Sequence, residues 1–342
     1  MTDNQNQYTT STPKPLSVLL AVHDQGAELQ RNLPLLLDQQ YEPGYEVIVV
    51  DESSSDDTED ILKQLKTRYP HLYSTYIPAS SHYVSRRKLA LTVGMKAANN
   101  EWVIITEASC HPEDESWLTA MASGMTDEHD VVCSYTAYAD GTKSRYAFLR
   151  LTNWRRQLWR PYRYDGACLA IRKSVFMQRN GFLHNLQYLR SEYDFLVNET
   201  PRDRINLLNT PESRLIQEEP TPKSWHNAQL FYMQSRSQLC RTFLQRLLFA
   251  TKQLLLHLGY ALSIAAIVAG ALLRHPVYIA IGAVLLLGLL VTRTLLARRK
   301  VAQSGEHIPL WKLPLLDLGI AWHYVYYKLR YLMADKYDFL RK

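Results

Sequence analysis

Two carboxylates directly follow an apolar run in this sequence, where they could bind a ligand. The run from Val47 to Val50 is typical of a strand buried on both faces of a parallel sheet, and Asp51 and Glu52 come next. Open α/β sheets bind their ligands beyond the carboxyl ends of the strands. A carboxylate there needs a partner such as a nucleoside or a cation. We therefore expect Asp51 and Glu52 to project into a site.

The acids that come next have a structural interpretation. Ser53 to Ser55 can cap the following helix, and the acids between residues 56 and 60 can complement the positive end of its dipole. We predict that role for these later acids. Asp51 gains nothing from capping, because it follows four β-branched core residues.

The elements that must position these carboxylates alternate along the chain. We expect strands at 17–22, 47–50, 72–77 and 102–105, and helices at about 29–37, 58–67 and 85–98. Such a series winds right-handed into a parallel sheet with helices on both faces. A strand at 131–135 and a helix at 145–159 follow. The sequence therefore predicts an α/β fold with a mostly parallel central sheet.

The composition limits the class of protein. The 342 residues carry a formal net charge of +6, with basic clusters such as 298–300 towards the C-terminus. This distribution suits contact with anionic lipid, and we find no compact nucleic-acid-binding motif. Four scattered cysteines argue against a zinc ribbon or a disulfide framework. Residues 1–14 are typical of a disordered lead and hold no apolar signal segment, so the catalytic part should stay in the cytosol.

Two apolar stretches near the C-terminus have the length of membrane spans. They cover residues 254–273 and 277–297, each about 20 residues, which suffices for ~30 Å of hydrocarbon. Basic residues flank both outer ends, so we expect these ends in the cytoplasm and the 274–276 turn outside. The alternative is a buried helical hairpin in a soluble protein. An aromatic-rich segment at 308–334 fits a helix lying in the membrane interface.

The strand end VDESSSDDT and several later motifs resemble the nucleotide-binding half of family 2 glycosyltransferases. The later motifs are a basic residue before A-L-x-x-G at 88–94, an acidic strand end at 107–109, a G-x-x-x-x-x-R-K-x-x-F segment at 166–176 and an acidic pair at 192–194. The resemblance covers residues 15–240. It implies a GT-A fold and an inverting transferase of the membrane-anchored bacterial type, with 241–342 as the membrane region.

The resemblance also implies roles for residues of the nucleotide half. The aspartate at the place of Asp51 binds the nucleoside in this family, and Asp24, just beyond the first strand, is a second and weaker candidate. A basic residue that reaches the phosphates matches Lys88 best, with Arg87 as the alternative. Gly166 matches a glycine that lets the backbone approach the donor sugar.

The metal-binding motif of the family is altered in this chain. The family reads D-x-D where this sequence has Glu107, Ala108 and Ser109, and the motif binds a divalent cation on the donor diphosphate. Magnesium or manganese prefers hard oxygen ligands, so Glu107 can serve and Ser109 is a weak neutral ligand. His111 is a conceivable further ligand or an ordinary loop residue.

The catalytic base of the family is the aspartate of an E-D pair that opens a helix. In one alignment Tyr193 takes the aspartate's place and Glu192 that of the glutamate. In the other, Asp194 matches an acid two places after the base and Glu192 is the base. The second keeps D-F-L in register with the usual D-x-L, so Glu192 is the first candidate and Asp194 the second. The alternative for both acids is a first helical turn capped by Ser191.

A last segment resembles the part of the family that closes the active site. It contains Lys223, Trp225 and Gln229. An indole can stack on a sugar ring or simply pack, and a lysine there could neutralise the leaving diphosphate.

The expected function is therefore transfer of a sugar from a nucleotide-sugar, first of all a UDP-sugar, to a lipid-linked or cell-envelope glycan acceptor. This hexosyltransferase would lie in the inner, cytoplasmic membrane with its catalytic domain facing the cytoplasm. The alternative is a catalytically degenerate relative that binds a nucleotide or a glycan-assembly partner without turnover, which the altered motifs favour. A nucleotide-binding oxidoreductase is excluded, because no G-x-G-x-x-G follows the first strand.

Overall fold

The chain folds as two compact units in the computed structural model, which describes residues 14–79, 85–302 and 304–334. Unit 1 comprises Met1–Thr136, Gly166–Gln187 and Glu199–Gln217, and unit 2 comprises Ala137–Asp165, Tyr188–Asn198 and Glu218–Lys342. The units are interleaved in sequence. The expected division into 15–240 and 241–342 stays a prediction. The expected disordered lead lies, apart from Lys14, outside the described residues.

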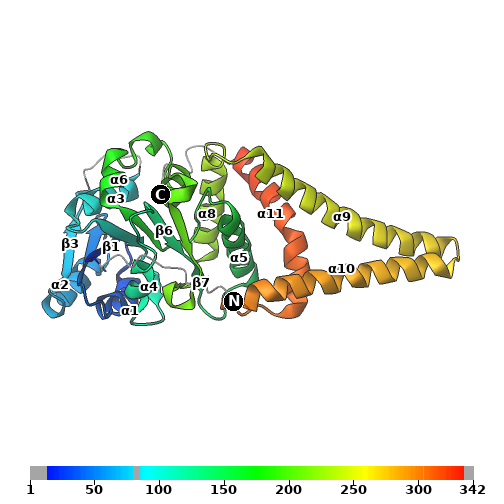
Figure 1. Cartoon of the computed structure of the whole chain (residues 1–342), viewed down its shortest axis with the longest axis horizontal. Helices are drawn as coiled ribbons and strands as arrows, with labels where there is room; N and C mark the ends of the chain where they lie inside the picture. The colour runs from blue at the N-terminus through cyan, green and yellow to red at the C-terminus, as the bar shows by residue number, and fades with distance from the viewer. Residues whose placement is uncertain (1–13, 80–84, 303, 335–342) are drawn as a thin grey trace, which may run out of the picture. The chain divides into compact units, whose positions relative to one another are not determined.

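Unit 1 is built on a seven-stranded sheet of order β3-β2-β1-β4-β8-β6-β9 (Figure 1). The neighbours β3, β2, β1 and β4 run parallel, β8 is antiparallel to both of its neighbours, and β6 and β9 are parallel again. The mostly parallel α/β sheet expected from the sequence is confirmed. The strands are β1 (Leu16–Val22), β2 (Tyr45–Asp51), β3 (Leu72–Tyr76), β4 (Trp102–Thr106), β6 (Val131–Ser134), β8 (Leu169–Arg172) and β9 (Ile205–Leu208).

Helices cover both faces of this sheet, because its central strands are apolar on both sides. Figure 1 shows α3 and α6 on one side and α1, α2 and α4 on the other. Leu33 of α1 shares a core cluster with Val18 and Leu20 of β1. On the other face, a Cβ on Gly94 of α3 would lie 2.1 Å from Cδ1 of Leu19, so α3 packs directly on β1. These helices are α1 (Gly26–Leu37), α2 (Thr58–Arg68), α3 (Arg86–Ala97), α4 (Trp117–Ala122) and α6 (Lys173–Gln178).

The short strands and 3₁₀ turns of unit 1 were not predicted from the sequence. The strands β5 (Cys110–Pro112) and β10 (Leu215–Gln217) pair antiparallel. Each has three residues, too few to show a period of two. Single 3₁₀ turns lie at Leu183–Asn185, Arg202–Arg204 and Pro211–Ser213, and the strand β7 (Thr136–Tyr138) lies where the chain passes from unit 1 to unit 2.

Unit 2 consists mainly of helices. They are α5 (Ser144–Trp159), α7 (Glu192–Asn198), α8 (Pro222–Ser235), α9 (Phe243–Leu272), α10 (Pro276–Ala302) and α11 (Leu313–Met333), with a 3₁₀ turn at Leu310–Lys312. A capping box starts α9, since the Thr242 hydroxyl accepts from the Gln245 backbone and the Gln245 side chain accepts from the Thr242 backbone.

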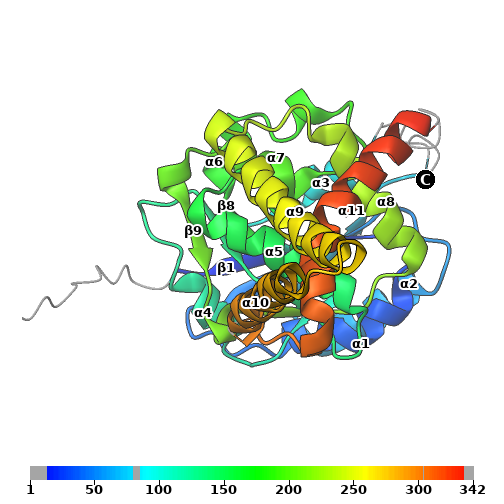
Figure 2. The same ribbon diagram turned by 90° about the vertical axis from the view of Figure 1, so that its right-hand side faces the viewer.

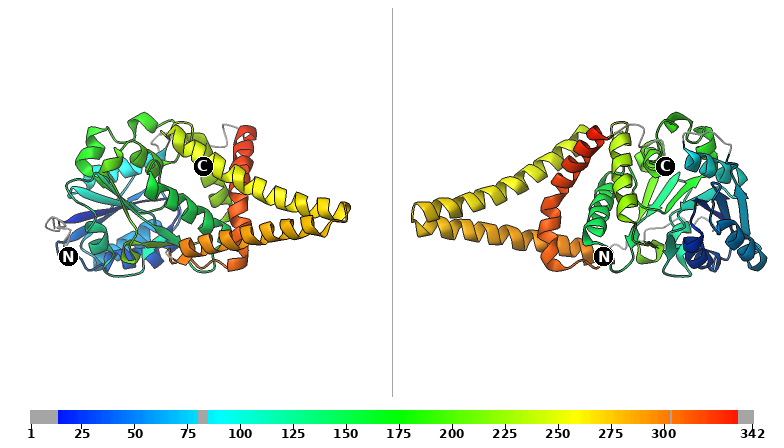
Figure 3. Two further views of the ribbon diagram at one scale, coloured as in Figure 1. Left: turned by 45° about the vertical axis from the view of Figure 1, so that its right-hand side comes forward. Right: turned by 180° about the vertical axis from the view of Figure 1, so that it is seen from behind.

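The helices α9 and α10 form an antiparallel hairpin (Figure 3). Both are long and apolar enough to cross a membrane, and only 17% and 6% of their most apolar windows are buried. Most of each window is therefore exposed on the described chain. Gly282 lets the two helices approach closely, because a Cβ there would lie 2.7 Å from the carbonyl oxygen of Ser263.

The aromatic-rich third segment is the helix α11, which lies beside α9 and α10 (Figure 2). Arg293 of α10 pairs with Asp317 of α11, and its Nε donates to Oδ2 at 2.6 Å. Arg293 lies near the end of the second apolar stretch, where a long side chain could extend to the membrane surface. The structure gives it a buried carboxylate partner on the neighbouring helix instead.

Candidate functional site

The ends of β1 and β2 are held together by hydrogen bonds between their following loops. Val22 lies opposite Asp51 in the parallel register. Oδ1 of Asp51 accepts from the backbone and the hydroxyl of Ser54, at 2.9 and 2.6 Å. Asp24 accepts from the backbone of Ser55 at 2.7 Å and donates its own N–H to the Ser54 hydroxyl. The two candidate nucleoside ligands therefore lie on one ordered edge of the sheet.

The hydrogen bonds leave part of each carboxylate available. Oδ2 of Asp51 makes no hydrogen bond with the part of the chain that the structure describes. The Ser55 backbone N–H lowers the pKa of the exposed Asp24 carboxyl, so this group is held in its charged form. Glu52, the third candidate, is buried, and its N–H donates to Val22 O at 2.8 Å.

Ser53 to Ser55 do not cap α2, in contrast to the expectation. Ser54 and Ser55 bind the two aspartates, and Ser53 has a positive φ of 62° while its hydroxyl donates to the Ile77 carbonyl. Asp56 accepts from the Thr58 N–H at 3.1 Å, so an acid takes the role predicted for it at the start of α2. The serines are instead needed to order the loop of Asp51.

The first turn of α3 carries three adjacent basic residues with different partners. Arg86 donates to the Glu52 carbonyl at 2.7 Å and orders the same loop. Arg87 pairs with Glu107, with 3.0 Å between Nη2 and Oε1. Lys88, the preferred phosphate candidate, is fully buried and donates to the Asn185 carbonyl at 2.5 Å. Of the two phosphate-binding candidates from the sequence, Arg87 is the one that contacts the altered D-x-D motif, through Glu107.

Both oxygens of Glu107 are engaged by hydrogen-bond donors. Arg87 holds Oε1, and the Gln217 side chain donates to Oε2 at 3.2 Å and to the Ser109 hydroxyl at 3.2 Å. A divalent cation needs several free oxygens. Among the described residues no three His, Cys, Asp or Glu side chains gather as a metal site. The donor set around Glu107 does not fit a divalent cation, because a guanidinium occupies the place of one.

Gly166 lies in a half-buried bend just before β8. The next N–H, from Ala167, donates to the Thr136 hydroxyl at 2.9 Å. The proposed approach of the backbone to a donor sugar stays a prediction at this position.

Glu192 is the first residue of α7 and is 4% exposed. Its Oε1 is buried and has no hydrogen-bond partner among the described residues. Burial of a carboxylate oxygen without a hydrogen-bond partner destabilises the fold. A purely structural role for Glu192 would not explain this cost. Ser191 has a positive φ of 78°, and its hydroxyl bonds that of Ser235 at 2.9 Å. The simple capping explanation therefore does not account for Glu192.

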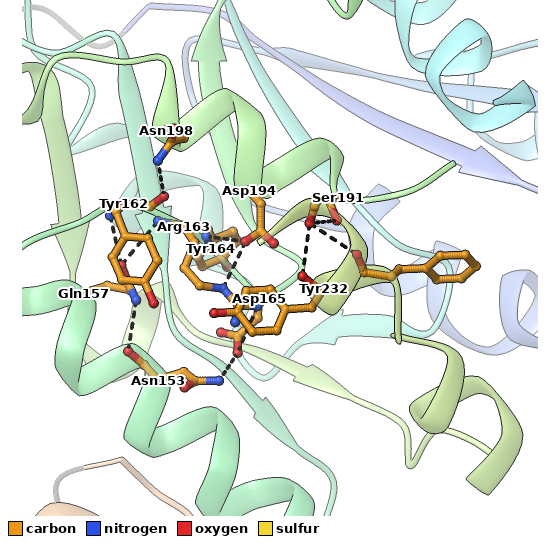
Figure 4. Close-up of polar contacts among 12 residues, drawn as sticks. Asn153, Gln157, Tyr162, Arg163, Tyr164, Asp165, Ser191, Asp194, Asn198 and Tyr232 are labelled. Carbon is orange, nitrogen blue, oxygen red and sulfur yellow. Dashed lines mark hydrogen bonds and ion pairs between the residues drawn. The ribbon is translucent and has the colours of Figure 1, made fainter. Parts of the chain in front are cut away.

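Asp194 lies on the same short helix in a different environment (Figure 4). Its Oδ1 accepts from Nε of Arg163 at 3.1 Å and from the Tyr164 N–H at 3.0 Å. The Arg163 guanidinium also faces Asp165 at 3.7 Å and lies 3.7 Å from the centre of the Tyr232 ring. Burial raises the pKa of Asp194 to about 6, and Arg163 opposes that rise. Asp194 thus anchors α7, while Glu192 keeps a free oxygen.

The residues of α8 are mostly engaged in packing. Trp225 is buried and stacked on Tyr146, with ring centres 4.2 Å apart, and the Arg145 guanidinium lies 5.0 Å from the indole. Gln229 bonds His323 at 3.2 Å. Lys223, one residue into the helix, is exposed. In this conformation the packing alternative describes Trp225 better than sugar stacking.

Comparison with known families now adds to this geometry. Residues 17–180 match the family described as glycosyl transferase family 2. The match covers a little under half of the chain and shows that this segment is similar to family 2 glycosyltransferases. The matched segment contains Asp24, Asp51, Arg87, Glu107 and Gly166.

Solved structures are similar to this chain, and the first of them shows its fold. The mannosyltransferase PcManGT from Pyrobaculum calidifontis, in complex with GDP-Man and Mn2+, matches with a TM-score of 0.52 and 16% identity over 97% of this chain and 86% of its own. S. aureus TarS 1-349 in complex with UDP-GlcNAc matches with a TM-score of 0.46 and 14% identity over 64% of this chain and 65% of its own. Comparison with the curated proteins finds no match. The GT-A fold expected from the sequence is confirmed.

The sequence patterns did not indicate three residues that contact the candidate acids or their partners. They are Arg163, Asp165 and Gln217, which fix Asp194 and Glu107. The segment Arg163 to Asp165 holds a cation and an acid just before Gly166, in otherwise aromatic surroundings, and this was the available signal. Gln217 gave no signal, because an amide three residues into a short strand has no distinctive pattern.

Proposed function

We propose that the protein transfers a sugar from a nucleotide-sugar to a membrane-associated glycan or lipid-linked acceptor, with inversion at the anomeric carbon. The observation that carries this proposal is the Glu192 carboxylate, which is buried and keeps one oxygen without a partner at the start of α7. A positioned carboxylate of this kind can accept the proton of an acceptor hydroxyl. The family 2 match supplies the reaction class.

The nucleoside of the donor would bind at the carboxyl ends of β1 and β2. Asp51 offers Oδ2 to a base or ribose, and the charged Asp24 offers a second acceptor beside it. Charge-assisted hydrogen bonds of this kind are the strong ones. PcManGT, which shares the fold, was solved with the nucleotide-sugar GDP-Man, and this supports the donor class; we retain a UDP-sugar as the first candidate.

The diphosphate would be neutralised by the basic turn of α3. Arg87 can exchange its contact with Glu107 for phosphate oxygens, since guanidinium binds both groups in the same bidentate geometry. The exposed Lys223 is a further cation for the leaving diphosphate. We derive no step through manganese or magnesium, because the altered motif supplies a single carboxylate, Glu107, and Gln217 binds its Oε2.

A panel of UDP- and GDP-sugars tests the donor site of the purified protein in detergent. We expect one donor to be transferred or hydrolysed both with manganese and with EDTA. Asp51→Ala should weaken binding of the matching nucleotide by about 10- to 100-fold in calorimetry, the value of a hydrogen bond to a charged group. Asp60→Ala is the matched control, because Asp60 is an exposed acid that, within the described parts of the chain, pairs only with the exposed Lys63. Equal affinity of Asp51→Ala and wild type would remove Asp51 from the site.

The hairpin of α9 and α10 is proposed to anchor the protein in the inner membrane with the catalytic part in the cytoplasm. Arg298 and Arg299 at the end of α10, and Arg241 and Arg246 around the start of α9, place the basic excess at the outer ends of the hairpin. The 274–276 turn would then lie on the far side.

Reporter fusions test this orientation. A phosphatase reporter inserted in the 274–276 turn should be active, because it lies outside the cytoplasm, and a fluorescent reporter after Lys342 should be active in the cytoplasm. A reporter inserted between Pro43 and Gly44, in a surface turn of unit 1, is the control for the cytoplasmic side. The opposite pattern would place the catalytic part away from cytoplasmic nucleotide-sugars.

A further inference from the structure

Unit 2 contains a cavity of about 570 Å³ next to the first turns of α9. Segments from α5, α8, α9 and α11 and from the connection between α8 and α9 line it. The volume lies in the range of sites for small ligands. We call it the basic cavity, because five of its lining residues are cations: Arg156, Arg236, Arg241, Arg246 and Lys252.

These cations have no carboxylate partners. None of the residues that line the basic cavity is Asp or Glu, and none of its five cations forms an ion pair with the described parts of the chain. Nε of Arg241 is buried and has no hydrogen-bond partner there. By contrast, the nearby Arg163 is paired with two carboxylates. Unpaired cations at close range repel one another, and a bound anion would relieve that repulsion.

Aromatic rings hold the guanidinium groups in place. Arg156 lies 4.2 Å from the centre of the Phe249 ring, and Arg236 lies 5.4 Å from that of Tyr324. Arg241 lies 5.7 Å from that of Tyr162. A ring face attracts the cation without using its N–H groups. Arg156 donates one N–H to the Tyr324 hydroxyl at 3.4 Å and Arg236 one to the Met233 sulfur at 3.8 Å, which leaves the other N–H groups of these arginines for an anion. The planar guanidinium group of arginine binds phosphate oxygens particularly well.

One wall of the basic cavity is apolar and continues along α9. Leu248, Phe249 and Ala250 line the cavity, and α9 then runs on as an exposed apolar helix. A free inorganic anion would make no apolar contact with that wall. A molecule with a phosphate at one end and a hydrocarbon chain at the other would satisfy the cations and the wall together.

We propose that the basic cavity binds the phosphate headgroup of an anionic membrane lipid, whose chain lies along α9. The proposal does not depend on sugar transfer, since none of its residues belongs to the candidate catalytic set. It does place the headgroup beside the structure that holds α7. Tyr232, which lines the cavity, stacks on Arg163, and the Asn198 side chain of α7 donates to the Tyr162 carbonyl at 2.7 Å.

Binding of short-chain lipids to the full chain in a neutral detergent tests the proposal. We expect dihexanoyl phosphatidic acid to bind in calorimetry and to raise the melting temperature. Dihexanoyl phosphatidylcholine should bind at least about tenfold more weakly, because its choline cation faces the arginines, and inorganic phosphate should also bind at least about tenfold more weakly, because it lacks the chain. Soluble short-chain lipids probe the cavity even if the hairpin is not inserted in a membrane.

Single substitutions locate the binding. Arg241→Gln and Arg246→Gln should each weaken phosphatidic acid binding by about tenfold, the value of one charge-assisted contact. Arg298→Gln is the matched control, because Arg298 is an exposed arginine outside the cavity. Arg246 is exposed as well, so its substitution decides the question if Arg241→Gln fails to fold.

Three results would overturn the proposal. The first is unchanged phosphatidic acid affinity in Arg246→Gln. The second is equal affinity for phosphatidic acid and phosphatidylcholine, which would mean that apolar contact alone drives binding. The third is equal affinity for inorganic phosphate and phosphatidic acid, which would assign the cavity to a free phosphate.

Discussion

Glu192→Gln should lower sugar transfer by ~10²–10⁴-fold while leaving donor binding nearly unchanged, the usual effect of removing a positioned general base. Glutamine keeps the shape of the side chain and its hydrogen bonding but cannot accept the proton of the acceptor. Glu192 is 4% exposed and its Oε1 has no partner among the described residues, so the substitution removes no hydrogen bond to that oxygen. Single-turnover transfer and calorimetry with the donor nucleotide separate the chemical step from binding.

Glu199→Gln is the matched control for this prediction. Glu199 follows the end of α7, and its carboxylate accepts from the Asn185 side chain at 2.5 Å, so it has a structural role. We expect less than about tenfold loss of transfer there, because that hydrogen bond contributes only ~1 kcal/mol. Transfer by Glu192→Gln at the rate of the wild type would show that Glu192 is not the base. A wild-type protein that binds nucleotide but transfers no donor would instead be the degenerate binder.

Arg163→Met should destabilise unit 2 by about 3–5 kcal/mol, because it leaves the buried Asp194 carboxylate without its cation. Arg163 and Asp194 side chains are 7% and 6% exposed, so water cannot replace the lost ion pair. A fall in the apparent melting temperature by roughly 10 °C would correspond to this loss. Thermal unfolding of the detergent-solubilised protein, followed by circular dichroism, measures it.

A double substitution separates the effect of the buried charge on stability from the effect of side-chain packing. Arg163→Met with Asp194→Asn should recover part of the stability, because no uncompensated charge then remains buried. Arg204→Met is the matched control: Arg204 also pairs with an aspartate, Asp130, but its side chain is 39% exposed. Its substitution should cost much less. A loss in Arg163→Met no larger than that in Arg204→Met would show that the Asp194 pair does not anchor α7.

The sequence by itself determined the parallel half of the fold and the position of Asp51 at the carboxyl edge of the sheet. Apolar runs such as Val47 to Val50 read as buried strands because burial on both faces requires an unbroken apolar segment. Asp51 could be placed at the ligand edge because it follows such a run and parallel strands end at one edge. The helices α9 and α10 were equally readable, since membrane length and apolarity are properties of a continuous segment.

Only the tertiary structure decided how the charged residues are paired. Gln217 reaches Glu107 across 110 residues of sequence, and Arg163 reaches Asp194 across 31. The insertion of β8 antiparallel between β4 and β6 was likewise not readable from the sequence. Local propensity and periodicity extend over one element, whereas an ion pair depends on how distant elements meet. For this reason the sequence suggested Glu107 as a cation ligand and Asp194 as the second candidate for the base, whereas the fold gives both a guanidinium partner. Oε1 of Glu192, the first candidate, has no hydrogen-bond partner among the described residues.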